Sequence, residues 1–165
     1  MKKIFSERIQ KIISNKAKLE KKLKVKIRGK NDEIFIEGNS EREYYAEKVI
    51  DALNFGFRIN VALLLSNDDF ILEVLNIKNY TRRKDLERIR ARIIGKKGKS
   101  LGALQQLTEC YFEIKDNKIG IIGNSENIEK AQEAIISIIR GAKHSHVYGS
   151  LEKNQKEPIL DFGLK

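Results

Sequence analysis

The sequence predicts an α+β fold in which one unit of secondary structure occurs twice, each time in the order strand, helix, helix, strand, strand, helix. Two matching segments are the main reason. Residues 11–18 match residues 92–99 at an offset of 81, and residues 38–41 match residues 123–126 at an offset of 85. In addition, the segment after the second match has one apolar face at helical spacing in both copies and closes on a glycine.

The second copy shows the order of elements most clearly. A β-rich stretch leads into a basic amphipathic helix, and a glycine-flanked turn separates that helix from a second one, for which Ser100 suits the N-cap position. Two strands joined by a short polar turn follow, and a long helix that begins at Asn124 or Ser125 closes the copy. The expected strands are 70–77, 111–115 and 118–122, and the expected first two helices are 84–94 and 100–110.

The first copy has the same elements in a shorter form. Its second helix is shorter, which accounts for the four residues that only the second copy holds between the two matches. An additional helix is expected to link the copies and to end at a polar turn over 66–69. The expected strands are 3–5, 24–28 and 33–37, the expected helices are 7–13, 17–23 and 40–54, and the linking helix is 57–65.

Length and composition exclude several classes of protein. At 165 residues and 19.0 kDa the chain is too small for a large multidomain enzyme. Its longest apolar run, 61–65, is far shorter than the roughly 20 residues that span a bilayer, and the N-terminus has no apolar targeting segment. We therefore expect a cytoplasmic protein with no membrane contact. One cysteine and two histidines favour neither a disulfide nor a closed zinc site, so we expect no metal and no other cofactor.

The positive charge of the chain is concentrated in two blocks. The net charge is +10, and residues 1–30 carry 12 basic and 2 acidic side chains, while residues 82–100 carry 9 and 2. Such blocks favour a polyanionic partner, because each neutralised phosphate releases condensed counterions. Composition alone is equally typical of the lysine-rich surface of a thermophilic protein. The position of the blocks in the fold must therefore decide between the two interpretations.

A glycine-bearing turn lies inside the second basic block, where Gly95-Lys96-Lys97-Gly98 joins two predicted helices. A nucleotide-binding P-loop is excluded, because Ile93 occupies the position of its first glycine and a helix, not a strand, precedes the turn. A pair of glycines two residues apart between helices instead resembles the GXXG loop of KH domains, which holds about four nucleotides of a single strand. The resemblance implies two tandem type I KH domains of order βααββα, each a three-stranded sheet packed on three helices.

The predicted RNA-binding residues follow from this loop. Glycines allow close approach to a sugar-phosphate backbone, lysines face the phosphates, and the following helix contributes its N-terminal N–H groups and dipole. Bases are expected in an apolar groove between Ile93 and Ile94 on one side and Ile114 on the other. The predicted phosphate and loop contacts are Arg88, Arg90, Arg92, Gly95, Lys96, Lys97, Gly98, Lys99 and Ser100. Peripheral contacts are predicted, from proximity in the chain, for Lys115, Lys143, His144 and Tyr148.

The first copy departs from the loop pattern, because Ser14-Asn15-Lys16-Ala17 contains neither glycine. We expect weaker or different binding there, with a packing or protein-docking role as the alternative. The expected domains are a first KH domain over 1–66 with the linking helix, a second KH domain over 67–153, and a flexible C-terminal tail over 154–165.

The pair of copies, together with the tail segments 140–148 and 151–153, resembles the archaeal relatives of the partner-of-Nob family, also called Dim-two. The resemblance covers about residues 1–153 and implies an assembly factor of the small ribosomal subunit. It further implies binding near the 3′ end of small-subunit ribosomal RNA, in concert with a Nob-family endonuclease and the alpha subunit of initiation factor two.

Two other function classes remain open at this stage. A twin-KH protein-interaction scaffold or a general RNA-binding regulator would use the same fold. An RNA-cleaving or RNA-modifying enzyme fits poorly, because the sequence has no paired carboxylates, no metal cluster and no nucleophile with an adjacent base. We therefore expect a protein that binds RNA without catalysis.

Overall fold

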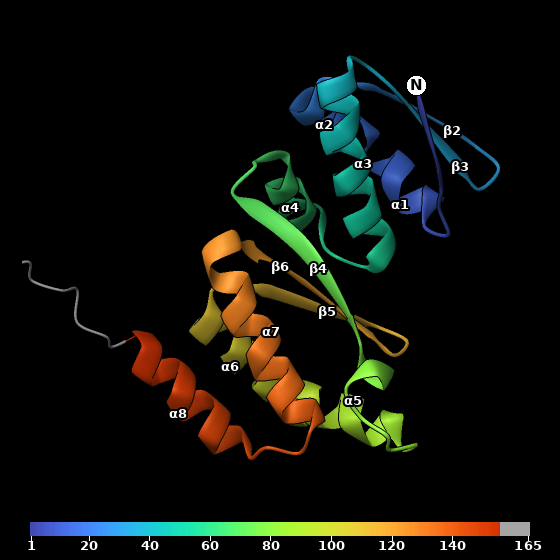
Figure 1. Cartoon of the computed structure of the whole chain (residues 1–165). Coiled ribbons are helices and arrows are strands. Elements are labelled where there is room, and N and C mark those ends of the chain that lie inside the picture. Colours follow the sequence, from blue (N-terminus) through green and yellow to red (C-terminus); the bar gives the residue numbers. More distant parts are fainter. Residues whose placement is uncertain (156–165) are drawn as a thin grey trace, which may run out of the picture.

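The computed structural model describes residues 1–155 and contains two α/β units, one above the other in Figure 1. In the first unit a three-stranded antiparallel sheet of order β1-β3-β2 has all its helices on one side. Alternating isoleucines of β2 and β3 are fully buried beneath these helices. The elements are β1 (Lys2–Phe5), α1 (Ile9–Ser14), α2 (Lys16–Leu23), β2 (Lys26–Lys30), β3 (Glu33–Glu37) and α3 (Ser40–Phe55).

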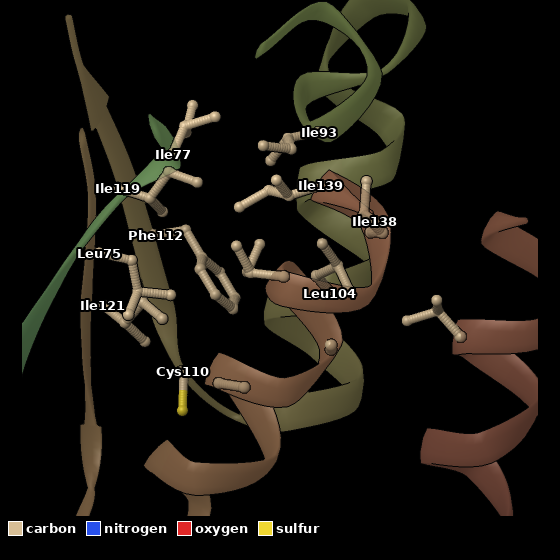
Figure 2. Close-up of a cluster of buried hydrophobic side chains, with 14 of the residues drawn as sticks. Leu75, Ile77, Ile93, Leu104, Cys110, Phe112, Ile119, Ile121, Ile138 and Ile139 are labelled. Atoms are coloured by element: carbon tan, nitrogen blue, oxygen red, sulfur yellow. The ribbon is translucent and has the colours of Figure 1, made fainter. Parts of the chain in front are cut away.

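The second unit repeats this architecture with a sheet of order β4-β6-β5. The expected α+β fold of two three-stranded sheets, each packed on three helices, is confirmed. Figure 2 shows the core of this unit, in which side chains of all three strands meet those of the helices. The elements are β4 (Phe70–Asn76), α5 (Leu86–Ile94), α6 (Lys99–Thr108), β5 (Tyr111–Lys115), β6 (Lys118–Asn124) and α7 (Ser125–Ile139).

The backbone reproduces the repeat in detail. Asn39 and Asn124, 85 residues apart, both cap the closing helix, each through a side-chain oxygen that accepts a backbone N–H. Three residues with positive φ, at helix ends and at the hairpin turn, also recur at this offset. The matched pairs are Lys24 with Glu109, Asn31 with Asp116 and Gly56 with Gly141.

The link between the units differs from the predicted helix over 57–65. Gly56 ends α3 and Arg58 is extended, so that α4 (Ile59–Ala62) is only four residues long, and a 3-10 turn over Leu63–Ser66 follows it. The tighter turn forms where the Ser66 hydroxyl donates to the Leu63 carbonyl, 2.7 Å away. It also buries Leu65 in the core of the first unit.

The sheet of the second unit is covered on both faces. Helices α5, α6 and α7 lie on one face, while on the other Ile122 is part of the core of the first unit. The rings of Phe55 and Phe57 lie directly over Gly120, where a Cβ atom would come within 2.8 to 2.9 Å of them. The two units therefore pack against each other across this second face of the sheet, while each keeps its own core.

A helix that the sequence did not predict follows the second unit. Helix α8 (His144–Gln155) packs on α6 and α7 and buries Val147 and Leu151. The signal is weak because Gly149 and two serines interrupt the helix and only those two apolar side chains are buried. The first two residues of the tail predicted over 154–165 belong to this helix, and its remainder lies outside the described residues. Within residues 1–155 none of the helices combines the length and apolar character that a membrane span requires.

Candidate nucleic-acid interface

The loop between α5 and α6 is a single tight turn. Helix α5 ends at Ile94, Gly95 is extended with a positive φ of 75°, and a 3-10 turn over Lys96–Gly98 leads into α6. The Gly98 N–H donates to the Gly95 carbonyl at 3.2 Å, and both Lys97 and Gly98 are left-handed. The turn thus holds its two lysines in a fixed, exposed bulge.

The two glycines of this loop have different structural roles. A Cβ on Gly95 would lie 2.5 Å from the Ser100 Cβ and 2.7 Å from the Ser100 nitrogen, so this glycine lets the loop close on α6. A Cβ on Gly98 would meet no atom within 4 Å. Gly102, one helical turn further on, has equally open space above it. The surface from Gly98 to Gly102 therefore leaves the backbone of α6 open to a ligand.

The first turn of α6 lies next to this bulge, and its first N–H, that of Lys99, donates to the Lys96 carbonyl. No side chain caps the helix, because Gly98 occupies the N-cap position. Ser100 is therefore not the N-cap that the sequence suggested. It lies two residues after the N-cap, is buried, and its hydroxyl accepts the hydrogen bond of the Tyr148 hydroxyl at 3.0 Å. Exposed lysines, the absence of a side-chain cap and the positive end of a ten-residue helix suit an anion at this position.

Two of the predicted phosphate contacts on α5 are engaged inside the protein. The Arg92 guanidinium donates to the Ile138 and Ala142 carbonyls, at 2.9 and 2.7 Å, and so holds the end of α7. The Arg90 guanidinium donates to the Asp116 carbonyl at 2.9 Å and ties α5 to the β5–β6 turn. Arg88 is exposed on the same helix. Among these three arginines only Arg88 is exposed.

The predicted apolar groove is only partly present. Ile93 is fully buried in the core and cannot contact a ligand, because it shares the inward face of α5 with Ile89. Ile94 is 38% exposed, and Ile114 on the edge strand β5 is partly buried. These two residues remain available as apolar walls.

A hollow between Gly102 on α6 and the start of β5 was not predicted. It has a volume of about 420 Å³, and it is lined by Gln105 and by Tyr111, whose ring is 42% exposed. The Gln105 Oε1 accepts the N–H of Phe112 at 3.1 Å and thereby orients the edge strand beside α6. The signal available in the sequence was an aromatic residue at the start of a strand adjacent to the loop helix.

The four predicted peripheral contacts fall in different places. The Lys115 ammonium donates to the Asn54 carbonyl at 3.3 Å and lies 3.7 Å from Glu7, so it links the two units and does not line the groove. Lys143 is exposed. The His144 Nε2 lies 2.8 Å from the Arg92 carbonyl at the end of α5, and Tyr148 bonds Ser100. The contacts of His144 and Tyr148 hold α8 against the end of α5 and the start of α6.

The corresponding site of the first unit lacks the clamp. Its turn, Ser14 to Ala17, contains no left-handed residue, and the Asn15 side chain donates back to the Lys11 carbonyl at 2.8 Å. Ile13, the counterpart of Ile94, packs against Gly29 of the edge strand β2, where a Cβ would come within 2.8 Å of it. In the first unit this isoleucine therefore lies close against the edge strand.

The described residues contain neither a cluster of metal-binding side chains nor a cysteine thiol with a lowered pKa. Within residues 1–155 no group of three or more histidine, cysteine or acidic side chains is placed to hold a metal ion. Burial raises the pKa of the Cys110 thiol to about 11, which disfavours the nucleophilic thiolate at neutral pH. The exposed positive loop is the feature of this unit that is suited to a ligand.

An intact GXXG loop between two helices, beside the edge strand of a βααββα unit that is itself repeated, defines a tandem KH-domain protein of type I. A family model described as a eukaryotic-type KH domain (KH-domain type I), that of the second KH domain of PNO1, matches residues 71–156. A KH domain-containing protein of Methanocaldococcus jannaschii is 30% identical, and the match covers 94% of this chain and 73% of that protein. The chain therefore belongs to the PNO1 family, also called Dim2.

Other relatives carry more specific names. The pre-rRNA-processing protein of Emericella nidulans is 36% identical over 111 residues, and the match covers 65% of this chain and 43% of that protein. The chain thus spans less than half the length of this fungal relative. The crystal structure of Dim2p from Pyrococcus horikoshii superposes with a TM-score of 0.82 at 28% identity and covers 92% of this chain and 98% of that one. A second Pyrococcus horikoshii structure, a complex of a/eIF2alpha, aDim2p and rRNA, gives 0.84 at 28% identity with 95% and 94% covered.

Proposed function

We propose that this protein binds single-stranded RNA through the loop Gly95 to Gly98 and acts in the biogenesis of the small ribosomal subunit. The observation that carries the proposal is the combination of an exposed two-lysine turn with the uncapped first turn of α6. Phosphates are the ligands that such a turn attracts, because both its side chains and its backbone carry positive potential. The pre-rRNA-processing names of the relatives supply the biological context.

The RNA follows α6 from the loop toward β5. Phosphates lie at Lys96, Lys97 and Lys99, and the strand passes over the open backbone at Gly98 and Gly102. Bases contact Ile94 and Ile114, and beyond them the strand reaches the hollow that Gln105 and Tyr111 line. The site thus keeps most of the predicted loop contacts and adds Tyr111 and Gly102. It omits the predicted side chains that the protein itself bonds or buries, which are Arg90, Arg92, Ile93, Ser100, Lys115, His144 and Tyr148.

The double substitution Lys96→Asp, Lys97→Asp tests the loop. Fluorescence anisotropy with a labelled oligonucleotide from the 3′ end of small-subunit ribosomal RNA measures the affinity at several salt concentrations. We expect binding to be lost at physiological salt, and the slope of log affinity against log salt to fall by about 1.4, because two phosphate contacts to a single strand are removed. Unchanged affinity and slope would overturn the assignment.

A matched control separates contact from net charge. Lys130→Asp, Lys153→Asp changes the charge equally, at exposed positions on α7 and α8 that lie toward the ends remote from the loop. We expect this variant to lose much less affinity than the loop variant. Equal losses in the two variants would show that binding depends on overall charge only.

We further propose that the RNA target is the 3′ region of small-subunit ribosomal RNA, and that the protein acts in the cytoplasm by binding and not by catalysis. The alpha subunit of initiation factor two is a proposed partner, supported by the complex solved for the Pyrococcus horikoshii protein. A Nob-family endonuclease is a second proposed partner. Crosslinking in cells followed by RNA sequencing tests the target, since reads concentrated at that 3′ end and lost in the loop variant support it. Scattered reads would favour a general RNA-binding regulator.

A further inference from the structure

The sheet of the first unit has one face that no other part of the described chain covers. Helices α1, α2 and α3 lie together on the opposite face (Figure 1). The strand register places three rows of side chains on the uncovered face, because residues directly opposite one another point the same way. These rows are Phe5, Glu33 and Lys30, then Lys3, Phe35 and Arg28, then Glu37 and Lys26.

Two aromatic rings lie on this face, Phe35 on its central strand and Phe5 at the end of the edge strand β1. Phe5 is 64% exposed, and it is the diagonal neighbour of Phe35 on the adjacent strand, since Phe5 opposes Glu33 and Phe35 opposes Lys3. Diagonal neighbours lie about 7 Å apart, within reach of each other's ring. The backbone beneath is held in place, because the Asn54 side chain donates to the Phe5 carbonyl at 3.2 Å.

The charges around the rings leave the face positive. Glu33 is paired with Lys3 at 2.8 Å, and Glu37 with Arg28. Lys26 and Lys30 have no ion-pair partner among the described residues. Charged side chains alternating with single rings are unsuited to the centre of a protein interface, which is depleted of charge. Exposed rings between cations are the arrangement on which the bases of a single strand stack while its phosphates are neutralised.

We propose that the uncovered face of β1, β3 and β2 is a second contact surface for single-stranded RNA, with bases stacked on Phe5 and Phe35 and phosphates at Lys26 and Lys30. This inference rests on the proposed function, because the strand is the same one that the loop of the second unit holds. It assigns an RNA-binding role to the first unit on its sheet, although its own loop has lost the clamp.

A series of contacts connects the two surfaces. Arg90 on α5 bonds the β5–β6 turn at Asp116, and the neighbouring Lys115 lies 3.7 Å from Glu7 of the first unit. Glu7 follows Phe5 by two residues. A strand that leaves the groove beside β5 therefore reaches the end of β1 by passing over this junction.

The test uses two lengths of RNA with the full-length protein. An oligonucleotide of about 6 nucleotides fills only the loop groove, and one of about 14 reaches the sheet. We expect Phe5→Ala to weaken binding of the longer RNA about ten-fold, as loss of one stacked base does, and to leave the shorter unchanged. Phe5→Tyr keeps the ring and should restore the affinity. Tyr44→Ala removes a ring of similar exposure, 51%, on α3 and should change neither.

Each outcome separates this inference from the proposed function. If Phe5→Ala binds the longer RNA like wild type while Lys96→Asp, Lys97→Asp binds neither, the sheet surface is refuted and the loop stands. If the loop variant binds both RNAs normally, the proposed function fails, and a Phe5→Ala defect on the longer RNA would still support the sheet. If Phe5→Tyr binds the longer RNA as weakly as Phe5→Ala does, the proposed stacking of a base on this ring is refuted. If Phe5→Ala impairs only binding of the initiation-factor alpha subunit, the face docks a protein and the inference is overturned.

Discussion

Replacing each glycine of the loop by alanine should distinguish Gly95, which folding requires, from Gly98, which keeps the backbone accessible to RNA. Gly95 has φ 75° and ψ 175°, a region that side chains avoid at a cost of about 1–3 kcal/mol. Its new Cβ would also be driven to 2.5 Å from the Ser100 Cβ, which adds overpacking of about 1–3 kcal/mol. Gly98→Ala meets no neighbour and adopts a left-handed conformation at about 1–2 kcal/mol. Gly95→Ala therefore loses about 2–6 kcal/mol, and Gly98→Ala less.

Thermal unfolding followed by circular dichroism measures the difference. For a chain of this size each kcal/mol lowers the Tm by about 2–4 °C, so we expect a fall of roughly 5–20 °C for Gly95→Ala and a smaller one for Gly98→Ala. Gly102→Ala is a control, because its Cβ also meets no atom within 4 Å and φ is not positive there. A Gly98→Ala variant as unstable as Gly95→Ala would refute the division of roles between the two glycines.

Three further predictions concern the surroundings of the loop. Tyr148→Phe removes the bond to Ser100 and should lower the free energy of unfolding by about 1 kcal/mol; a Tm equal to wild type would contradict the docking of α8 described above. Arg92→Gln should lose about 2–4 kcal/mol of stability yet keep the salt dependence of RNA binding, since its guanidinium bonds two carbonyls; a reduced salt slope would make it a phosphate contact after all. Burial raises the pKa of the Cys110 thiol from 9.0 to about 11, so the folded protein holds this proton more tightly than the unfolded chain does. The contribution of the protonated thiol to the free energy of unfolding is therefore complete below pH 9 and is lost as the pH rises through 11. Unfolding measured from pH 8 to 11 should show that loss in wild type but not in Cys110→Ala.

The sequence predicted the repeated architecture well because its signals are local. The asparagine caps, the turn residues and the spacing of buried isoleucines act within a few residues of one another, and each recurs at a constant offset. Strands 33–37 and 111–115 have the bounds that the pattern indicated. Lys96, Lys97 and the two glycines were likewise identifiable, since a glycine pair in a basic block between helices is a local pattern.

The remaining site residues depend on partners that are distant in the chain. The direction of the Arg92 guanidinium is decided by carbonyls at Ile138 and Ala142, and that of Lys115 by the other unit. The spacing of residues in the sequence does not indicate which rotamer such a side chain adopts. Helix α8 is a similar case, because its stability comes from packing on α6 and α7 and not from its own sequence. Ile93 differs, since its spacing from Ile89 already placed it on the buried face.

The sheet that is buried on both faces determines how the protein can be dissected. A fragment beginning at the polar turn before β4 would expose Ile122, Phe70 and Leu72, which in the intact chain pack into the first unit. An isolated second unit would therefore expose an apolar surface that favours aggregation. Its measured solubility or RNA affinity would reflect this exposed surface and not the properties of the unit in the intact protein. Removing the second unit instead would expose Phe55 and Phe57, which pack against Gly120 in the intact chain. The two halves of this chain are better studied by single substitutions in the whole protein than as separate domains.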